Sequence, residues 1–284
     1  MAMLQQHNGS CLFYRKSGSG DPVLLLHASG CTGGSWQGLV SEFGTKFTLY
    51  TPDLAGCGRS SRDYISEGAG LREEAEFIAP LLSQIDEPVH LVGHSFGGVV
   101  ALAAALAWPE RIKTLTLYEP VAFYLLRDGG GADRKKFELF RRVTEDMKWF
   151  IGNGANDRAA AIFVDFWSGP GTWDRLPAAQ QDDLSQAVLK MPAFRVIADE
   201  RWNAEDFHRL HFPVAILRGD RSPPASLRIA EILADLIPAA RLIAIPGLGH
   251  MAPVTHPRAV APVIADCLSQ RGAGETSPQL AAAE

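Results

Sequence analysis

A serine between two glycines has the setting of a nucleophile. Ser95 lies in a Gly-x-Ser-x-Gly pattern formed with Gly93 and Gly97. The apolar residues 89–92 before it predict a buried strand, and the Ala- and Leu-rich residues 99–106 after it predict a helix. A sharp strand-to-helix turn would expose the serine hydroxyl at the carboxyl edge of a sheet, with glycines where the two backbones come too close for a Cβ. The helix start offers free N–H groups to a developing anion.

A serine hydroxyl needs a base, and His250 is the best candidate. It lies in the glycine-rich turn 246–251, directly after the apolar run 241–245. A third group must fix the tautomer of that base and stabilise the imidazolium. Among the other histidines, we expect His27 to form structural hydrogen bonds and His94 to point away from the serine.

The elements that position these residues alternate between strand and helix. This order predicts parallel βαβ units with right-handed crossovers, and therefore an α/β fold. The predicted strands are residues 11–15, 23–26, 47–50, 89–92, 112–118, 213–217 and 241–245, and the predicted helices between and after them are 35–43, 71–85, 99–106, 225–237 and 257–270.

The pattern changes between about residues 120 and 212. This stretch contains helix-like segments at 134–150, 155–166, 178–190 and 193–203, with many aromatic residues that could line a pocket. We therefore expect a core formed by residues 1–120 and 213–271, a helical cap formed by 121–212, and a disordered tail at 272–284. The aromatic residues of the cap are Phe123, Tyr124, Phe137, Phe140, Trp149, Phe150, Phe163, Phe166, Trp167, Trp173, Phe194 and Trp202.

The chain resembles the α/β-hydrolase superfamily over nearly its whole length. Four motifs occur in that family's order: His27-Ala28-Ser29-Gly30 at the HGxG-type loop, the D-x-x-G-x-G-x-S segment 53–60, the Gly-x-Ser-x-Gly segment 93–97, and the turn 247–250. Alanine replaces the usual second glycine of the first motif. The resemblance implies a mostly parallel central sheet flanked by helices, and an oxyanion hole formed by the backbone N–H groups of Ser29 and Phe96.

Two carboxylates compete for the role of triad acid. Many relatives place the acid as G-x-x-D after the strand that follows the cap, but here Gly219 is followed by Ser222 at the fourth position. Asp220 lies two residues earlier. Glu119 ends the strand that follows the Ser95 helix, a position that some relatives use for the acid. We favour Glu119 and keep Asp220 as the alternative.

A serine nucleophile limits the reactions that this fold can perform. Haloalkane dehalogenases and epoxide hydrolases of the family need a carboxylate where Ser95 stands, which leaves acyl transfer. The leading hypothesis is a carboxylic ester hydrolase acting on a small, partly apolar molecule. The alternatives are a C–C bond hydrolase of aromatic ring-cleavage products and a relative that binds a small ligand with little turnover. The sequence predicts neither a metal nor an organic cofactor.

The composition of the chain limits which partners and which cellular compartment we expect. The chain has 284 residues, 46% of them hydrophobic, and a net charge of −5, which gives no electrostatic case for nucleic acid or an anionic membrane. The scattered cysteines favour a reducing, cytoplasmic setting, and we see neither an apolar leader nor a membrane span. A homodimer is compatible with the sequence, although no motif indicates one. The cysteines are Cys11, Cys31, Cys57 and Cys267.

Overall fold

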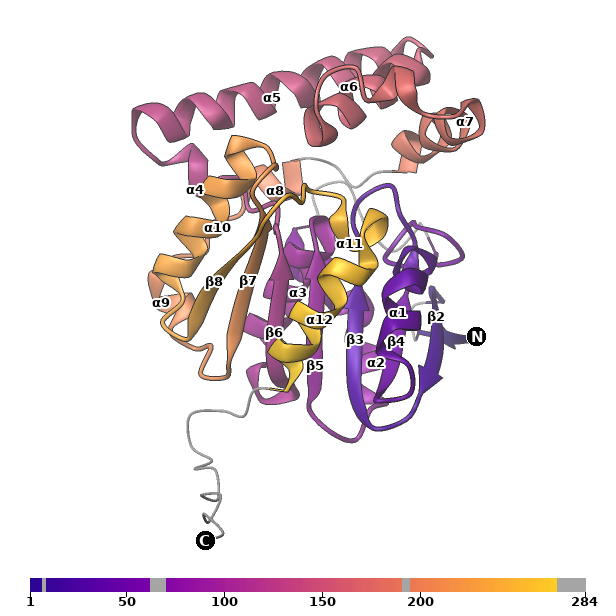
Figure 1. Cartoon of the computed structure of the whole chain (residues 1–284), viewed down its shortest axis with the longest axis vertical. Coiled ribbons are helices and arrows are strands. Elements are labelled where there is room, and N and C mark those ends of the chain that lie inside the picture. The colour runs from indigo at the N-terminus through magenta and orange to yellow at the C-terminus, as the bar shows by residue number, and fades with distance from the viewer. Residues whose placement is uncertain (7–8, 62–69, 191–194, 270–284) are drawn as a thin grey trace, which may run out of the picture.

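A single mostly parallel sheet organises the chain (Figure 1). The computed structural model describes residues 1–6, 9–61, 70–190 and 195–269. Eight strands lie in the order β1-β2-β4-β3-β5-β6-β7-β8, with β1 and β2 antiparallel to their neighbours and all other pairs parallel. The strands are β1 Ala2–Gln5, β2 Cys11–Gly18, β3 Asp21–Leu26, β4 Phe47–Pro52, β5 Val89–His94, β6 Ile112–Tyr118, β7 Val214–Gly219 and β8 Ala240–Ile245.

Helices cover both faces of the sheet because successive strand side chains point to opposite faces. In β3, Leu24 and Leu26 pack with the helices of one face, and Val23 and Leu25 pack with those of the other. The predicted α/β fold with a mostly parallel, helix-flanked sheet is confirmed. The first face carries α2 Leu71–Ser83, α3 Phe96–Ala107 and α10 Pro224–Leu236, and the second carries α1 Gln37–Phe43, α11 Ala252–Thr255 and α12 Pro257–Leu268.

A run of helices separates β6 from β7, where the sequence predicted helices but no buried strand. Figure 1 shows α5, α6 and α7 lying above the sheet. A small apolar cluster around Met147 and Ala160 holds α5 and α6 together. These helices are α4 Tyr124–Arg127, α5 Gly131–Gly152, α6 Asn156–Ser168, α7 Ala178–Ala187, α8 Arg195–Asp199 and α9 Ala204–Phe207.

The structure differs from the predicted elements at a few places. β1 was not predicted, because its sequence AMLQ is only four residues long. The predicted helix 193–203 is wrong in extent: α8 ends at Asp199, and residues 191–194 lie outside the described ranges. The predicted tail 272–284 also lies outside them. Within the described part, no helix combines the length and apolarity needed to cross a bilayer.

Candidate active site

Ser95 occupies a strained turn between β5 and α3. Its backbone has φ 56° and ψ −116°, a conformation that residues with a Cβ rarely adopt. The turn is tight enough that a Cβ on Gly93 would collide with the backbone of Gly97, and a Cβ on Gly97 would collide with the carbonyl oxygens of Leu26 and His27. The glycines on either side are therefore required by the close approach of strand and helix, as the sequence predicted.

Glu119 occupies a second strained position, immediately after β6. Its φ is 45°, and among the described residues only Ser95 and Glu119 combine a side chain with a positive φ. The Glu119 N–H donates to the Leu217 carbonyl at 2.9 Å, which anchors the strained residue to β7. Such strain persists only where the surroundings enforce it, and it concentrates at functional sites.

The structure brings Ser95, His250 and Glu119 into one hydrogen-bonded chain. Ser95 Oγ lies 3.0 Å from His250 Nε2, and His250 Nδ1 lies 2.8 Å from Glu119 Oε2. Because a carboxylate only accepts, Nδ1–H donates to Glu119 and Nε2 is left to accept the serine proton, which assigns the tautomer from the network. Exposures of 5%, 3% and 0% for the three residues show that water is largely excluded.

The two carboxylates that the sequence left open have different partners. Glu119 Oε1 accepts from the Gly219 N–H at 2.7 Å and from the Ser222 hydroxyl at 2.5 Å, so both of its oxygens are bound. Asp220 is exposed and accepts from the Gly247 N–H at 2.7 Å, which supports the turn before His250. The structure therefore places Glu119, and not Asp220, on the imidazole.

The resemblance implied the backbone N–H groups of Ser29 and Phe96 as the donors of an oxyanion hole. The amides of Ser29 and Phe96 donate to no other residue within the described ranges, and Phe96 is the first residue of α3. A helix start adds the positive end of its dipole. Both N–H groups are thus free to donate to a substrate oxygen, and their role as the oxyanion hole stays a prediction.

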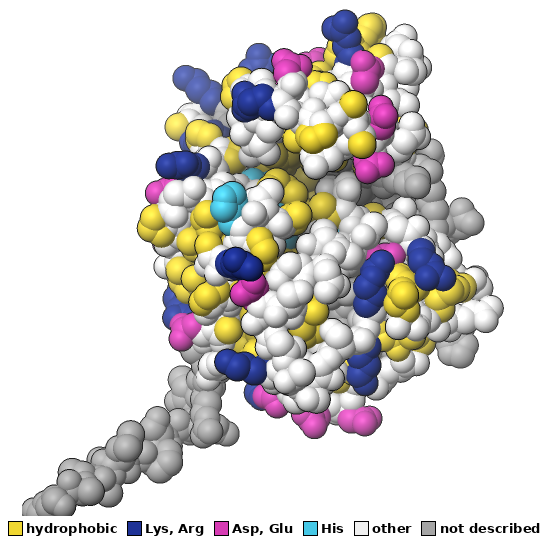
Figure 2. All heavy atoms as spheres, turned by 45° about the vertical axis from the view of Figure 1, so that its right-hand side comes forward, with side chains coloured by type: hydrophobic (Ala, Val, Ile, Leu, Met, Phe, Trp, Pro, Cys, Tyr) yellow, Lys and Arg dark blue, Asp and Glu magenta, His cyan; other side chains and the backbone are white. Residues whose placement is uncertain are grey.

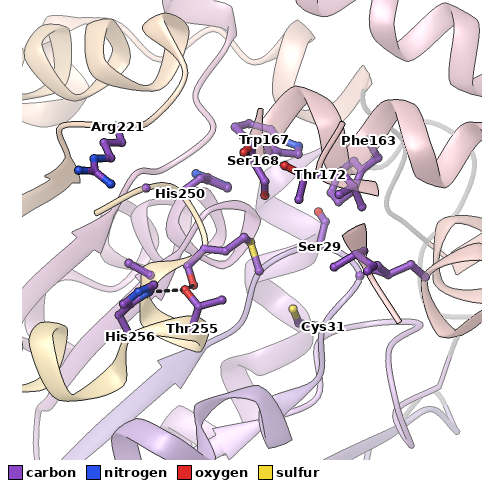
Figure 3. A pocket seen from close by; sticks show the side chains of 17 residues that line it. Ser29, Cys31, Phe163, Trp167, Ser168, Thr172, Arg221, His250, Thr255 and His256 are labelled. Atoms are coloured by element: carbon purple, nitrogen blue, oxygen red, sulfur yellow. Dashed lines mark hydrogen bonds between the residues drawn. The ribbon is translucent and has the colours of Figure 1, made fainter. Parts of the chain in front are cut away.

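A cavity of about 460 Å³ opens beside the triad histidine (Figure 3). Figure 2 shows hydrophobic side chains gathered in the hollow below the upper helices. The cavity is lined by Ser29, Gly30, Cys31, Phe163, Val164, Trp167, Ser168, Thr172, Leu176, Leu184, Arg221, Gly249, His250, Met251, Ala252, Thr255 and His256. Most of the lining surface is apolar, so the cavity suits a small molecule with an apolar part. Among the described residues, no cluster of histidine, cysteine or acidic side chains could hold a metal ion.

Comparison with known proteins establishes the family. The sequence model of the alpha/beta hydrolase family matches residues 23–263. The chain belongs to this family. It is 32% identical over 258 residues to a pimeloyl-(acyl-carrier protein) methyl ester esterase of Aliivibrio salmonicida, a match that spans 86% of this chain and 91% of the relative. It is 25% identical over 281 residues to the 2-hydroxymuconate semialdehyde hydrolase of a Pseudomonas species, over 92% and 91% of the two chains.

A solved structure gives the same relationship. The hydrolase superposes on a thermophilic esterase from Thermogutta terrifontis with a TM-score of 0.69 and 25% identity, covering 93% of this chain and 96% of that one.

The remaining motifs of the hydrolase have structural partners. Asp53 is fully buried and accepts from the Gly33 N–H at 2.8 Å and the Arg59 N–H at 2.9 Å, which ties the loop after β3 to the loop after β4. His27 Nε2 accepts from the Leu54 N–H at 2.9 Å, and Nδ1 donates to the Ala28 carbonyl. Burial lowers the pKa of His27 to about 4, so it stays neutral. The predicted structural role of His27 fits these contacts.

Sequence reasoning missed the residues that hold the His250 turn. His94 Nε2–H donates to the His250 carbonyl at 2.8 Å, and the Tyr118 hydroxyl donates to the Gly249 carbonyl at 2.9 Å. Burial holds the pKa of His94 well below its usual range, so its imidazole is neutral. The sequence predicted only that His94 would point away from Ser95. It did not indicate a hydrogen bond to His250, which is distant in the sequence.

Sequence reasoning also could not single out Trp167 among the aromatic residues. Its indole, on α6, stacks on the His250 ring with centroids 4.1 Å apart and planes 19° apart. Trp167 also packs edge-on against Phe123 and Phe166. The helices between β6 and β7 therefore contribute directly to the surroundings of the triad histidine.

Proposed function

We propose that the protein is a serine hydrolase that cleaves a carboxylic ester through an acyl-enzyme on Ser95. The observation that carries the proposal is the buried chain from Ser95 Oγ through His250 to Glu119, with distances of 3.0 and 2.8 Å. It lies beside an apolar cavity and near unpaired backbone amides. Membership of the hydrolase family and an ester-cleaving relative at 32% identity support the same reaction class.

In the first half-reaction, Ser95 Oγ attacks the ester carbonyl while its proton moves to His250 Nε2. The carbonyl oxygen becomes an oxyanion that the Ser29 and Phe96 N–H groups stabilise. Glu119 holds Nδ1–H and stabilises the imidazolium. When the tetrahedral intermediate collapses, the C–O bond of the ester breaks and His250 returns the proton to the departing alcohol.

In the second half-reaction, a water molecule replaces the alcohol. His250 Nε2 takes one of its protons, and the resulting hydroxide attacks the acyl carbon bound to Ser95. Collapse of this second intermediate releases the carboxylic acid, and His250 returns the proton to Ser95 Oγ. The stack of Trp167 on His250 supports this cycle, since it limits the orientations of the imidazole.

The substrate partner is proposed to be a small, partly apolar molecule. The cavity volume of about 460 Å³ and its apolar lining support this proposal. Residues 121–212 would then act as the cap of the cavity, because α6 and α7 supply part of its lining. A cytoplasmic location and a homodimer remain proposals, the first supported by the scattered cysteines.

C–C bond hydrolysis is the alternative reaction for the same residues. It is favoured by the 25% identity to a 2-hydroxymuconate semialdehyde hydrolase across 92% of this chain. Both reactions need a serine, a histidine and an acid, so the triad geometry does not separate them. Turnover of simple esters distinguishes ester hydrolysis from C–C bond hydrolysis.

The test is hydrolysis of p-nitrophenyl esters from acetate to octanoate. We expect turnover by the wild type and by Ser83→Ala, a matched change on the exposed side of α2, and loss of at least about 10³-fold in Ser95→Ala. Turnover retained by Ser95→Ala would contradict the proposal. Binding of these esters without turnover by the wild type would favour a ligand-binding protein, and inactivity towards all of them would favour the C–C reaction.

A further inference from the structure

One fully charged side chain, that of the exposed Arg221, lies at the edge of the active-site cavity. Among the residues that line it, Arg221 is the single arginine, and no lysine, aspartate or glutamate is present. The cavity otherwise offers apolar groups, hydroxyls, a thiol and two imidazoles. An arginine in such surroundings gives the cavity a local preference for negative charge.

The guanidinium of Arg221 has no partner within the described part of the chain, neither an acceptor nor a carboxylate. Its backbone is fixed, because the Arg221 N–H donates to the Leu248 carbonyl at 2.9 Å. The neighbouring carboxylate of Asp220 is bound to the Gly247 N–H. Arg221 is therefore held at the cavity with its hydrogen-bond donors available.

His256 adds a second polar group on the same side of the cavity. Figure 3 shows Arg221 and His256 on one side of His250, and Ser29 on the other. The Thr255 hydroxyl donates to the Met251 carbonyl at 3.1 Å, so His256 Nδ1–H donates to Thr255 Oγ1 at 2.8 Å. This tautomer leaves Nε2 of an uncharged His256 as a hydrogen-bond acceptor, so Arg221 supplies the donors for an anion on this side of the cavity.

We propose that the natural substrate carries a carboxylate in addition to the scissile ester, and that Arg221 binds it. The inference rests on the proposed ester hydrolysis and names the substrate class for that site. A planar guanidinium matches a carboxylate with two parallel hydrogen bonds. The protein carries a net charge of −5, so a local cation at this cavity would favour the approach of an anionic substrate.

Paired substrates test the proposal. For a carboxylate on the acyl side, the pair is a p-nitrophenyl hemi-ester of succinic or adipic acid and the p-nitrophenyl alkanoate of equal length. For a carboxylate on the alcohol side, the pair is a 3-acyloxybenzoate and its methyl ester. The readout is the ratio of kcat/KM for the charged and neutral member, measured for the wild type, Arg221→Gln, Arg221→Lys and the surface control Arg72→Gln.

We expect Arg221→Gln to lower this ratio about tenfold in one of the two series. This is the low end of the effect of a charge-assisted hydrogen bond, because the guanidinium stays partly in water. Arg221→Lys should keep only part of the ratio, because it retains the charge but not the paired hydrogen bonds. Arg72→Gln should keep all of the ratio, although it changes the net charge equally. The preference of the wild type should also weaken as salt is raised. A ratio that Arg221→Gln leaves unchanged in both series would overturn the proposal.

A binding measurement separates this inference from the proposed reaction. In a Ser95→Ala background, calorimetry with monomethyl adipate and dimethyl adipate reports the carboxylate preference without turnover. Tighter binding of the monomethyl ester that is lost with Arg221→Gln would support the subsite even if ester hydrolysis failed. Equal binding of the two esters would refute the subsite even if ester hydrolysis were established.

Discussion

Replacing Glu119 by glutamine should disable the enzyme through the tautomer of His250. Two donors, the Gly219 N–H and the Ser222 hydroxyl, converge on Glu119 Oε1. Because both are donors, the glutamine would place its carbonyl oxygen at the position of Oε1. Its NH₂ group would then face His250 Nδ1. An NH₂ group donates, and it would therefore favour the imidazole with its proton on Nε2, which cannot accept the proton of Ser95.

The expected loss in kcat is about 10³- to 10⁴-fold, which corresponds to roughly 4–5.5 kcal/mol of transition-state stabilisation. The assay is steady-state hydrolysis of the best p-nitrophenyl ester, with circular dichroism to show that the variant is folded. Asp220→Asn is the matched control. Its side-chain oxygen can still accept from the Gly247 N–H, so we expect kcat within about threefold of the wild type.

The opposite pattern would refute this reasoning. If Asp220→Asn lost activity by orders of magnitude while Glu119→Gln kept more than about a tenth of it, Glu119 would not orient the histidine. Glu119→Asp adds a second check, because its shorter side chain cannot satisfy Gly219 and His250 from the same backbone position. We expect it to lose activity as well, which would show that position as well as charge matters.

Three further changes test the surroundings of the triad. Trp167→Leu should lower kcat/KM by roughly 2- to 12-fold because it removes a ring stack on His250 worth roughly 0.5–1.5 kcal/mol, and Trp167→Phe should restore most of the loss in steady-state assays. Gly97→Ala should lower the free energy of unfolding by roughly 1–3 kcal/mol in urea titrations, while Gly152→Ala, whose Cβ meets open space, should not. Burial raises the pKa of Glu74 from 4.5 to about 8, so the folded state retains a proton that the unfolded state releases, and this group's contribution to stability falls as pH rises between those values. Glu74→Gln removes that contribution, so its stability relative to the wild type should increase by up to about 1.4 kcal/mol per pH unit between pH 5 and 8.

Each of these has a clear opposite result. Equal activity of the Trp167→Leu and wild-type enzymes would show that the stack does not position His250. Equal stability of the Gly97→Ala and Gly152→Ala variants would show that a Cβ at position 97 meets no costly backbone collision. A stability difference between Glu74→Gln and the wild type that does not change with pH would show that Glu74 is ionised in the folded protein.

The positions of Ser95, His250 and Glu119 could be predicted because each follows a strand of a parallel sheet. The carboxyl ends of parallel strands meet at one edge, so residues distant in sequence become neighbours there. The same argument left Asp220 as a competitor, since it also follows a strand. Only the strained backbone at Glu119 and the bonds that its carboxylate accepts separate the two.

Other contacts depend on orientations that a sequence pattern does not encode. Trp167 lies on α6, and its stack on His250 depends on how that helix is packed over the sheet. The bond from His94 to the His250 carbonyl depends on the path of a turn that is 156 residues away in the sequence. The charge of Arg221 was visible in the sequence, but its place at the cavity required the structure.

Covalent labelling tests the central claim most directly. A fluorophosphonate presents a tetrahedral phosphorus to the activated serine, whose oxygen displaces fluoride and remains bonded to phosphorus. Peptide mass spectrometry of the labelled wild type should place the adduct on Ser95, and labelling should slow markedly in His250→Ala and in Glu119→Gln. An adduct on another residue, or equally fast labelling of Ser95→Ala, would contradict the account.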